Sequence, residues 1–273
     1  MEKLLDEIES YWSTRTEGYS EVNHKELAGT QKNAWLKVLT SQFPDKPKEE
    51  IRILDIGTGP GFFPVILAEA GYHVDAVDYT EGMLEKAKEN AGELCQNIRF
   101  QRMDAQKLEF ADNTFDVVIS RNLTWNLEHP DVAYREWVRV LKAGGKLLNF
   151  DANWYGYLYE EEQRKAYEND RKNVENNSLD DHYLCTDIER MERIALQVPL
   201  SKISRPQWDV KTLREAGLLG IHTDTEIWKT VWSEEERLNY QSTPMFMVTG
   251  VKPDHFLNLP VVEGEKTEGF LEI

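Results

Sequence analysis

The stretch "RILDIGTGPGFF", residues 52 to 63, joins an apolar run to a loop with three glycines at alternate positions. A short run of branched apolar residues is typical of a buried strand, and the apolar residues from Phe62 onward favour a helix. A strand that enters a glycine-rich turn before a helix N-terminus brings bare backbone and N–H groups next to a polar ligand. The stretch therefore predicts a ligand-binding loop at one end of a β-sheet.

The spacing of the glycines excludes two kinds of ligand loop. Gly57, Gly59 and Gly61 read G-x-G-x-G, whereas the dinucleotide fingerprint is G-x-G-x-x-G. A P-loop is excluded because no Gly-Lys-Ser/Thr follows. Asp55 stands just before the first glycine, where a carboxylate disfavours pyrophosphate and favours an ammonium group. We therefore expect a zwitterionic or cationic ligand.

A second acidic residue indicates a sugar. Asp78 ends the next strand-like run, about twenty residues after the loop, where a carboxylate can accept hydrogen bonds from both hydroxyls of a ribose. The ligand is therefore predicted to contain a nucleoside.

Strand and helix patterns alternate from residue 51 onward, which predicts an α/β fold with a mostly parallel sheet covered on both faces. The predicted core strands are 51–56, 73–78, 98–103, 115–120 and 146–151, and two further strand-like runs, 221–228 and 244–251, are expected to pair antiparallel at a sheet edge. The predicted helices are 62–70, 81–91, 131–141 and 210–218.

Composition narrows the class of protein. The 273 residues, 40% of them apolar, can form one elaborated domain, and the net charge of −17 disfavours nucleic acid and anionic membranes as partners. The start "MEKLLDEIES" lacks the features of a signal peptide, and no apolar run of membrane-spanning length is present, so a cytoplasmic protein is expected. Cys95 and Cys185 are too few for a disulfide framework and lack metal-binding spacing, so no metal is expected.

Three longer segments carry a family resemblance. "LDIGTGPGFFPVILAEAGYHVDAVDYTEGMLEKAKE", "MDAQKLEFADNTFDVVISRN" and "REWVRVLKAGGKLLNFD" resemble, in order and spacing, the motifs of class I S-adenosylmethionine-dependent methyltransferases of the small-molecule type, with a methyltransferase-11-like core. The resemblance covers about residues 51 to 151. It implies a Rossmann-like seven-stranded sheet with helices on both faces and the last strand antiparallel.

The resemblance also implies roles for residues around the cofactor S-adenosyl-L-methionine and its product S-adenosyl-L-homocysteine. Asp55 and the backbone of Gly57, Gly59 and Gly61 would hold the amino acid end, Asp78 the ribose, Tyr79 and Met83 the adenine faces, and Asp104 and Ala105 the adenine edge. Tyr19 and Asn122 complete the predicted cofactor set. Each role has a plainer alternative: a simple strand-to-helix turn for the glycines, solvated strand ends for Asp78 and Asp104, and core packing for Met83.

Two segments outside this core are candidates for binding the methyl acceptor. The helix-like N-terminal segment, which includes "ESYWSTRTEGYSEVNHKE", resembles a lid that folds over the cofactor, and residues 152–207 form a long insertion after the fifth strand, where lids grow in open α/β folds. The residues predicted to face the acceptor are Tyr11, Trp125, Asn153, Trp154 and Tyr155, with Asn122 beside them; local packing is the alternative for each. Trp12 is a weaker candidate, and His182 is interpreted as a hydrated loop histidine rather than a base.

These patterns divide the chain into five segments. They are an N-terminal helical lid (1–45), the cofactor-binding core (46–151), a helical insertion that caps the substrate (152–207), the C-terminal part of the core (208–252) and an acidic tail (253–273).

The predicted function is methyl transfer to an O, N or S atom of a small-molecule acceptor by in-line displacement. After the fourth strand the chain reads "SRNLTWNLEHP" instead of Asn/Asp-Pro-Pro-Tyr, which disfavours methylation of amides and nucleobase amines, and no cysteine is placed for covalent pyrimidine methylation. The alternatives are a noncatalytic S-adenosylmethionine-binding regulator or partner subunit, and an NAD-dependent dehydrogenase. The catalytic residues, the acceptor and the oligomeric state are left open by the sequence.

Overall fold

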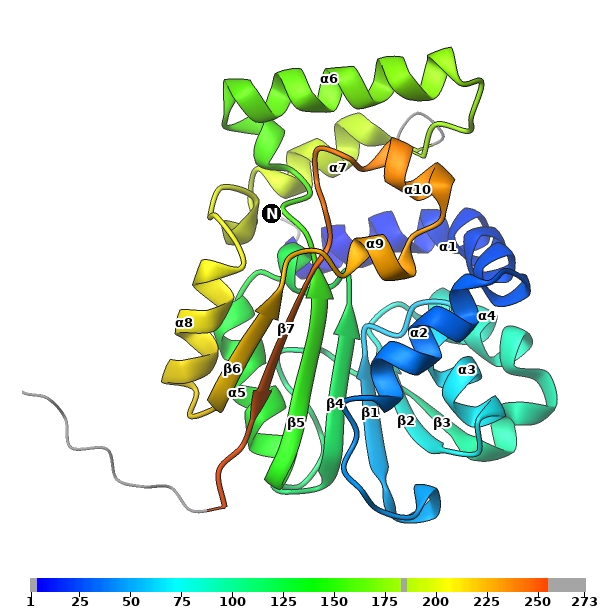
Figure 1. The fold of residues 1–273 in the computed structure, drawn as a ribbon, viewed down its shortest axis with the longest axis vertical. Coiled ribbons are helices and arrows are strands. Elements are labelled where there is room, and N and C mark those ends of the chain that lie inside the picture. The colour runs from blue at the N-terminus through cyan, green and yellow to red at the C-terminus, as the bar shows by residue number, and fades with distance from the viewer. Residues whose placement is uncertain (1–3, 183–185, 255–273) are drawn as a thin grey trace, which may run out of the picture.

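The computed structural model describes residues 4–182 and 186–254 and contains a seven-stranded sheet (Figure 1). The strands are β1 (Arg52–Ile56), β2 (His73–Asp78), β3 (Ile98–Arg102), β4 (Phe115–Arg121), β5 (Leu141–Asp151), β6 (Leu219–Asp224) and β7 (Phe246–Val251), in the spatial order β3-β2-β1-β4-β5-β7-β6. Strands β1 to β5 pair in parallel, and β7 is antiparallel to both β5 and β6. The predicted Rossmann-like sheet with an antiparallel last strand is confirmed.

Ten α-helices surround the sheet in the described part of the chain. They are α1 (Leu4–Ala28), α2 (Gln31–Thr40), α3 (Phe62–Glu69), α4 (Glu81–Ala91), α5 (Pro130–Val140), α6 (Glu161–Asn176), α7 (Ile188–Ala195), α8 (Gln207–Glu215), α9 (Trp228–Val231) and α10 (Glu234–Asn239). None of the helices within residues 4–182 and 186–254 combines the length and hydrophobicity needed to cross a membrane.

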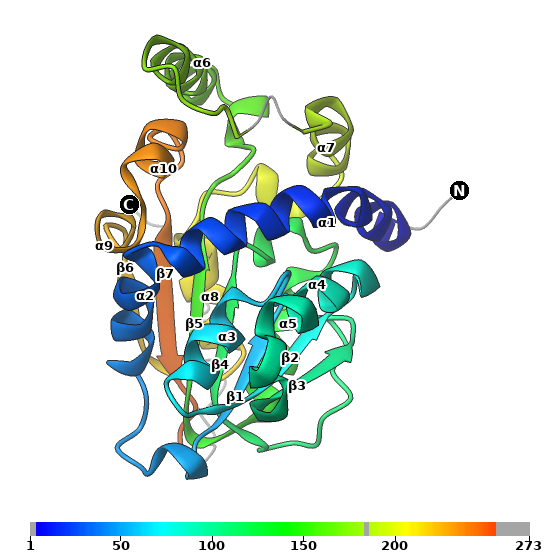
Figure 2. The ribbon, with the colours of Figure 1, turned by 90° about the vertical axis from the view of Figure 1, so that its right-hand side faces the viewer.

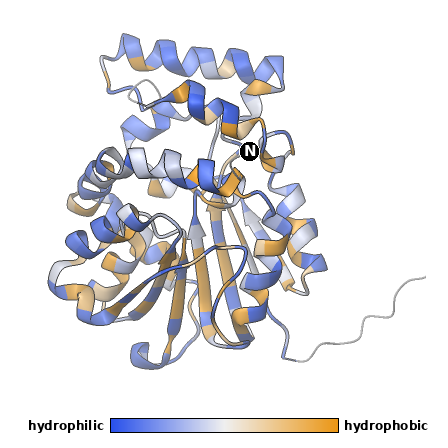
Figure 3. Cartoon of the chain, turned by 180° about the vertical axis from the view of Figure 1, so that it is seen from behind, coloured by the Kyte–Doolittle hydropathy of each residue, from blue (hydrophilic) through white to orange (hydrophobic). Residues whose placement is uncertain are grey.

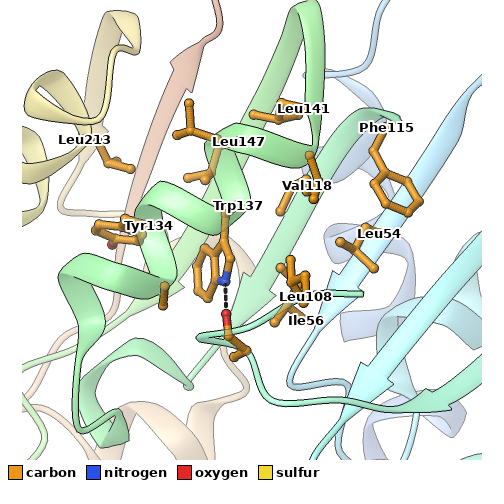
Figure 4. Close-up of a cluster of buried hydrophobic side chains, with 14 of the residues drawn as sticks. Leu54, Ile56, Leu108, Phe115, Val118, Tyr134, Trp137, Leu141, Leu147 and Leu213 are labelled. Carbon is orange, nitrogen blue, oxygen red and sulfur yellow. Dashed lines mark hydrogen bonds between the residues drawn. The ribbon is translucent and has the colours of Figure 1, made fainter. Parts of the chain in front are cut away.

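Alternate residues of the central strands belong to two hydrophobic cores, one on each face of the sheet. Leu54 and Ile56 of β1 pack with Trp137 of α5 and Leu213 of α8 on one face (Figure 4). The intervening Ile53 belongs to the core of the other face. Because both faces of the central strands are buried, these strands read as almost continuous apolar runs in the sequence.

Helix α1 lies across the edge of the sheet at which the parallel strands end (Figures 1 and 2). It contacts α3 and α4 below and α7 above, and Figure 2 shows it between the sheet and the layer of α6, α7 and α10. Helix α6 lies at the far end of that layer and is largely hydrophilic in Figure 3, whereas apolar residues are concentrated in the strands. Helices from three separate parts of the chain therefore cover the carboxyl ends of the strands.

The predicted N-terminal lid, residues 1–45, consists of two helices with different positions. Helix α1 covers the strand ends, but Trp35 and Leu39 of α2 are buried in the core on one face of the sheet. The description as a lid therefore fits α1 and is corrected for α2, which is part of the layer that covers the sheet.

Two predicted strand boundaries are also corrected. The strand predicted at 221–228 ends at Asp224, because the Asp224 carboxylate accepts a hydrogen bond from the Glu226 amide at 2.8 Å and turns the chain. The fifth strand begins at Leu141, which was assigned to the preceding helix, and Gly144, with φ +73°, lies in the register shift that follows. Cys185 and residues 255–273 of the predicted tail lie outside the described residues.

Candidate functional site

A cavity lies where β1, β2 and β4 end beneath α1. Ten of the eleven residues predicted to bind the cofactor line it: Tyr19, Asp55, Gly57, Gly59, Asp78, Tyr79, Met83, Asp104, Ala105 and Asn122. Gly61 does not line this cavity. It precedes α3 with φ +90°, and a Cβ atom there would lie 3.0 Å from the Cβ atom of Ala87, so Gly61 permits close packing of α3 against α4.

The glycine loop has a left-handed backbone at two positions on the cavity wall. Gly57 has φ +69°, and a Cβ atom there would lie 2.7 Å from the Leu123 side chain. Gly59 has φ +53°, and its Cβ atom would point at the ring of Tyr19 on α1, 3.7 Å away. A side chain at Gly57 would therefore clash with Leu123, whereas a side chain at Gly59 would lie between the glycine loop and α1.

Asp78 at the end of β2 is joined to this loop. Its Oδ2 atom accepts a hydrogen bond from the Gly59 amide at 2.9 Å, and its Oδ1 atom accepts one from the Thr80 amide at 2.9 Å. Burial raises the pKa of the Asp78 carboxyl, and the amide donors oppose that rise. The carboxylate is thus oriented by backbone donors, and each oxygen keeps a lone pair for another donor.

Asp55 lies at the end of β1 with 2% of its surface exposed. Burial raises the pKa of the Asp55 carboxyl to about 7; the nearby Arg121 opposes the rise and Asp78 adds to it. Charge on Asp55 is therefore sensitive to any cation that enters the cavity.

At the opposite end of the cavity, a tryptophan of the hydrophobic core fixes the backbone of the cavity wall. The indole Nε1 of Trp137 donates to the carbonyl oxygen of Ala105 at 2.9 Å, the bond that Figure 4 shows as a dashed line. The Asp104 carboxylate accepts from the amide of Gln106 at 2.8 Å, which fixes the turn. The guanidinium of Arg102 lies 5.0 Å from the centroid of the Tyr79 ring. Met83 is buried and also lines the same cavity, so core packing and contact with a ligand are compatible at this position.

Helix α1 is held over the cavity by polar contacts and by Ile8 and Tyr11, which are buried in an apolar cluster with α7. Trp12 Nε1 donates to Asn126 Oδ1 at 2.7 Å, and Arg102 donates to Glu9 at 2.9 Å. The Arg102 and Glu9 side chains are 46% and 28% exposed, and such ion pairs add little stability. This ion pair therefore contributes little to the attachment of the N-terminal half of α1.

The C-terminal half of α1 is anchored by Arg121. This guanidinium donates to both carboxylate oxygens of Glu26, at 2.7 and 3.0 Å, and lies against the ring of Phe62 at 4.7 Å. The pair is largely buried, with side chains 17% and 7% exposed. Sequence analysis did not single out Arg121, because an arginine at a strand end carries no distinctive spacing.

A second cavity of about 610 Å³ adjoins the first on the far side of α1. The two cavities share Trp12, Tyr19, Asn23, Arg121 and Asn122 as lining residues. Tyr11, Trp125, Trp154 and Tyr155, all predicted to face the acceptor, line the second cavity.

Asn153 lines neither of these cavities, and its predicted position is corrected. Its side chain donates to the carbonyl oxygen of Arg205 at 3.1 Å and accepts from the Arg205 amide at 3.0 Å. Both hydrogen-bonding ends of Asn153 are thus used to hold the chain at Arg205, and the side chain is structural.

Two tryptophans of the second cavity are held by one buried carboxylate. Asp151 accepts from the backbone amide of Trp125 at 3.0 Å and from the indole of Trp154 at 3.1 Å. Arg205 donates to Asp151 at 2.6 Å and to Asp209 at 2.6 Å, and all three side chains are inaccessible to solvent. The network links the end of β5 to α8 and fixes two walls of the cavity.

Much of the remaining wall comes from residues 232–240, for which sequence analysis predicted no helix or strand. Trp232, Glu236, Tyr240 and Met245 line the second cavity, and His182 joins them. The ring of His182 lies 2.9 Å from the Tyr240 hydroxyl and 3.0 Å from a Glu235 oxygen, so its interpretation as a hydrated histidine is wrong. A signal for α10 was present, because Ser-x-x-Glu from Ser233 to Glu236 is a capping box, and the structure contains it.

Several buried polar atoms around the first cavity have no hydrogen-bond partner within residues 4–182 and 186–254. They are Asn23 Oδ1, Thr58 Oγ1, Asn122 Oδ1 and Asn126 Nδ2. Asn122 also has φ +57°, in the left-handed region that asparagine adopts more readily than most residues with a side chain. Unpaired buried groups of this kind can bind a polar ligand or water. None of the described residues forms a group of three or more His, Cys, Asp and Glu side chains that could hold a metal ion.

Comparison with known proteins agrees with this geometry. Residues 54–149 match a family model described as a methyltransferase domain. The chain carries a class I S-adenosylmethionine-dependent methyltransferase domain. The match spans the glycine loop, the strand end at Asp78 and the turn at Asp104, which are the elements around the first cavity.

Individual relatives of the methyltransferase domain are distant. A demethylmenaquinone methyltransferase of Bacteroides fragilis is 29% identical over 54% of this chain and 60% of its own length, so the chain spans about three fifths of that relative. A solved structure of a putative S-adenosyl-L-methionine-dependent methyltransferase of Methanococcus maripaludis is 20% identical, with a TM-score of 0.58, and the match covers 90% of this chain and 95% of that one.

A second solved structure is phosphoethanolamine N-methyltransferase 2 of Haemonchus contortus in complex with S-adenosyl-L-methionine. It is 19% identical, with a TM-score of 0.61, over 85% of this chain and 56% of that chain. At these identities the structural matches establish the fold of the methyltransferase domain.

Proposed function

We propose that this protein transfers a methyl group from S-adenosyl-L-methionine to an O, N or S atom of a small molecule by in-line displacement. The observation that carries the proposal is the junction of two cavities. One is lined by the glycine loop and the strand-end carboxylates, and the other, aromatic and larger, shares Tyr19 and Asn122 with it.

The residues of the first cavity fit the proposed cofactor. The unpaired oxygens of Asn23 and Asn122 suit the N–H donors of its ammonium group, and the unpaired Nδ2 of Asn126 suits its carboxylate. The Asp78 carboxylate suits the two ribose hydroxyls. The Tyr19 ring lies 3.7 Å from the Cβ position of Gly59, so a side chain there would occupy the gap between the loop and α1 into which the cofactor must fit.

Adenine would lie between Tyr79 and Met83, with Asp104 and Ala105 at its edge. The hydrogen bond from Trp137 fixes the Ala105 carbonyl, so this end of the cavity is rigid before any ligand enters. Bound there, the cofactor supplies an electrophilic methyl group on a sulfonium sulfur.

The chain's own residues contribute mainly binding, orientation and exclusion of water. Tyr19 and Asn122 stand between the cavities, and the second cavity holds an acceptor with its nucleophilic atom directed at that junction. Holding two reactants in line can itself supply most of a rate enhancement, so no general base is assigned. Helix α1 closes the junction and keeps water out.

The names of the relatives do not fix the acceptor. They refer to demethylmenaquinone in one case and phosphoethanolamine in another, two unlike molecules. The acceptor of this chain must therefore be inferred from its own second cavity.

Calorimetry with S-adenosyl-L-methionine, S-adenosyl-L-homocysteine and NAD tests the binding half of the proposal. We expect both sulfur compounds to bind and NAD not to bind; tight binding of NAD alone would favour a dehydrogenase. Turnover of methyl-labelled cofactor with a metabolite extract tests the chemical half. Cofactor binding without transfer to any small molecule would favour a noncatalytic regulator.

A further inference from the structure

Part of the second cavity is a box of aromatic rings with a carboxylate beside it. Trp154, Trp232 and Tyr240 line the cavity, and the Tyr240 ring centroid lies 5.2 Å from that of Trp154 and 5.7 Å from that of Trp232. The ring planes meet at 84° and 53°, so the rings form sides of a box and not a stack. Glu236 lines the same cavity. Aromatic faces around one space attract a cation.

The Glu236 carboxylate has an unused oxygen. Its Oε2 atom accepts from the Ser233 amide at 2.8 Å and from Gln31 Nε2 at 2.5 Å. Its Oε1 atom has no hydrogen bond, and Glu236 has no ion pair, within residues 4–182 and 186–254. A carboxylate that is mostly withdrawn from water without a counter-ion is unfavourable, and a positively charged ligand would remove that cost.

Carboxylates outnumber basic side chains in the lining of the second cavity. Five carboxylates and three basic side chains line it. Of the basic groups, Arg121 is paired with both oxygens of Glu26, and Lys25 lies 72% exposed at 3.8 Å from Asp180. Burial, with a further contribution from Glu26, raises the pKa of the Glu236 carboxyl to about 7, although the Ser233 amide and the positive charge of Arg121 oppose the rise.

We propose that the second cavity recognises its ligand through an amine or quaternary ammonium group, which is held in the box of Trp154, Trp232 and Tyr240 with Glu236 as its counter-ion. The inference rests on the proposed function in that it takes this ligand to be the methyl acceptor. Tyr240 is held in place for this role by His182, whose ring nitrogen lies 2.9 Å from the Tyr240 hydroxyl.

Choline provides a direct binding probe, because its uncharged analogue dimethylbutanol and its anionic counterpart dimethylbutyrate have nearly the same shape. With S-adenosyl-L-homocysteine present, calorimetry or saturation-transfer NMR should give choline the lowest Kd of the three. Glu236→Gln should weaken choline about tenfold and leave dimethylbutanol unchanged, because a charge-assisted contact is lost. Trp232→Leu should weaken choline more than dimethylbutanol, because only the cation loses the attraction of an aromatic face.

The Glu236→Gln variant is a clean test of charge, because glutamine also serves at this position of a capping box and can still accept the Ser233 and Gln31 bonds. Glu234→Gln, in the same turn of α10 but exposed, removes the same charge and should leave choline binding unchanged. Equal or tighter binding of dimethylbutanol or dimethylbutyrate, absence of saturable choline binding, or an unchanged Kd in Glu236→Gln would overturn the inference.

This test is independent of the proposed function, since it measures binding and not turnover. If choline binds in the box while S-adenosyl-L-methionine does not bind to the protein, the methyl-transfer function fails and the cation site stands. If the cofactor binds and turns over while choline shows no charge preference, the cation site fails and the methyl-transfer function stands.

Discussion

The backbone amide of Gly59 donates a 2.9 Å hydrogen bond to the carboxylate of Asp78, so the glycine loop and the end of β2 form one unit. Loop and carboxylate are 19 residues apart in the sequence and belong to different strand–helix units. The ribose site and the amino acid site of the proposed cofactor are therefore coupled through this bond.

Asp78→Ala should weaken S-adenosyl-L-methionine and S-adenosyl-L-homocysteine alike, by roughly 1 to 3 kcal/mol, because the shared ribose loses a charged acceptor. Calorimetry with both ligands measures the change. Asp75→Ala, in the same strand but outside the cavity lining, is the matched control. A loss confined to one of the two ligands would contradict the ribose role.

Gly59→Val should abolish cofactor binding, because the new side chain would fill the space between the loop and Tyr19. Its left-handed backbone adds a stability cost of about 1 to 2 kcal/mol. Gly92→Val is a control for substitution at a positive-φ glycine outside the cavity, since Gly92 has φ +51° and nothing within 4 Å of its Cβ position. Both variants should lower the unfolding free energy, and only Gly59→Val should lose ligand; equal ligand affinity in the two variants would show that the loop does not contact the cofactor.

The pH dependence of cofactor binding should follow Asp55, whose pKa is raised by burial to about 7. Below pH 7 this carboxyl is largely protonated, and an ammonium group would favour its charged form. Affinity for S-adenosyl-L-homocysteine should therefore rise as pH increases toward 7, by up to about tenfold per unit, and level off above it. Arg121 and Asp78 are the charged groups that face Asp55.

Calorimetry in buffers of different ionisation enthalpy should detect proton release on binding below pH 7. Asp55→Asn should flatten the pH profile, while Glu236→Gln, in the second cavity, should leave it intact. A profile that persists in Asp55→Asn would assign the titration to another group.

Asp151→Asn should uncouple the acceptor from the cofactor. The variant leaves Arg205 buried with Asp209 as its counter-ion and alters the acceptor shared by Trp125 and Trp154. We expect a loss of about 1 to 3 kcal/mol in unfolding free energy, because the amide cannot replace every buried hydrogen bond of Asp151 while Arg205 keeps Asp209, and a higher KM for the acceptor with little change in S-adenosyl-L-homocysteine affinity.

Chemical denaturation and ligand titration measure these two effects separately. The exposed pair of Arg135 and Asp131 offers a contrast, since Arg135→Ala should change stability by less than about 1 kcal/mol. An unchanged acceptor KM in Asp151→Asn would limit this network to a role in stability.

The sequence predicted the first cavity well because its determinants are local. The loop from Asp55 to Gly59 and the strand end at Asp78 carry their chemistry within a few residues of a recognisable strand, and parallel strands bring their ends to one edge. Gly61 was assigned to the ligand although its φ and the nearby Ala87 show a packing role. The spacing of glycines in the sequence does not show whether the absent side chain makes room for a ligand or for a neighbouring helix.

The second cavity was predicted only in part, because its walls are assembled by tertiary contacts. Trp154 and Trp232 line the same cavity although they are about eighty residues apart in the sequence. Asn153, next to Trp154, instead forms hydrogen bonds with Arg205. Residue type indicated aromatic walls, but which neighbour turns toward the cavity depends on the Asp151 network, which has no local sequence pattern.

Deletion of residues 1–20 should reduce methyl transfer far more than it reduces cofactor binding or folding. It removes Tyr11, Trp12 and Tyr19 from the cavity walls, together with the bond from Trp12 to Asn126, but it keeps Glu26 and its pair with Arg121. The sheet and both of its cores remain, since the core residues on its two faces begin at Trp35. Because the lid excludes water and fixes the acceptor, turnover should fall by orders of magnitude while S-adenosyl-L-homocysteine still binds, more weakly. Limited proteolysis of the intact protein provides a companion measurement, in which α1 should be cut more readily without ligand than with it, because a ligand bound beneath α1 adds contacts to its closed position. Full turnover in the truncated protein, or cleavage unaffected by ligand, would assign Tyr11 and Tyr19 to packing and leave the acceptor to the walls formed by residues 152–207 and α10.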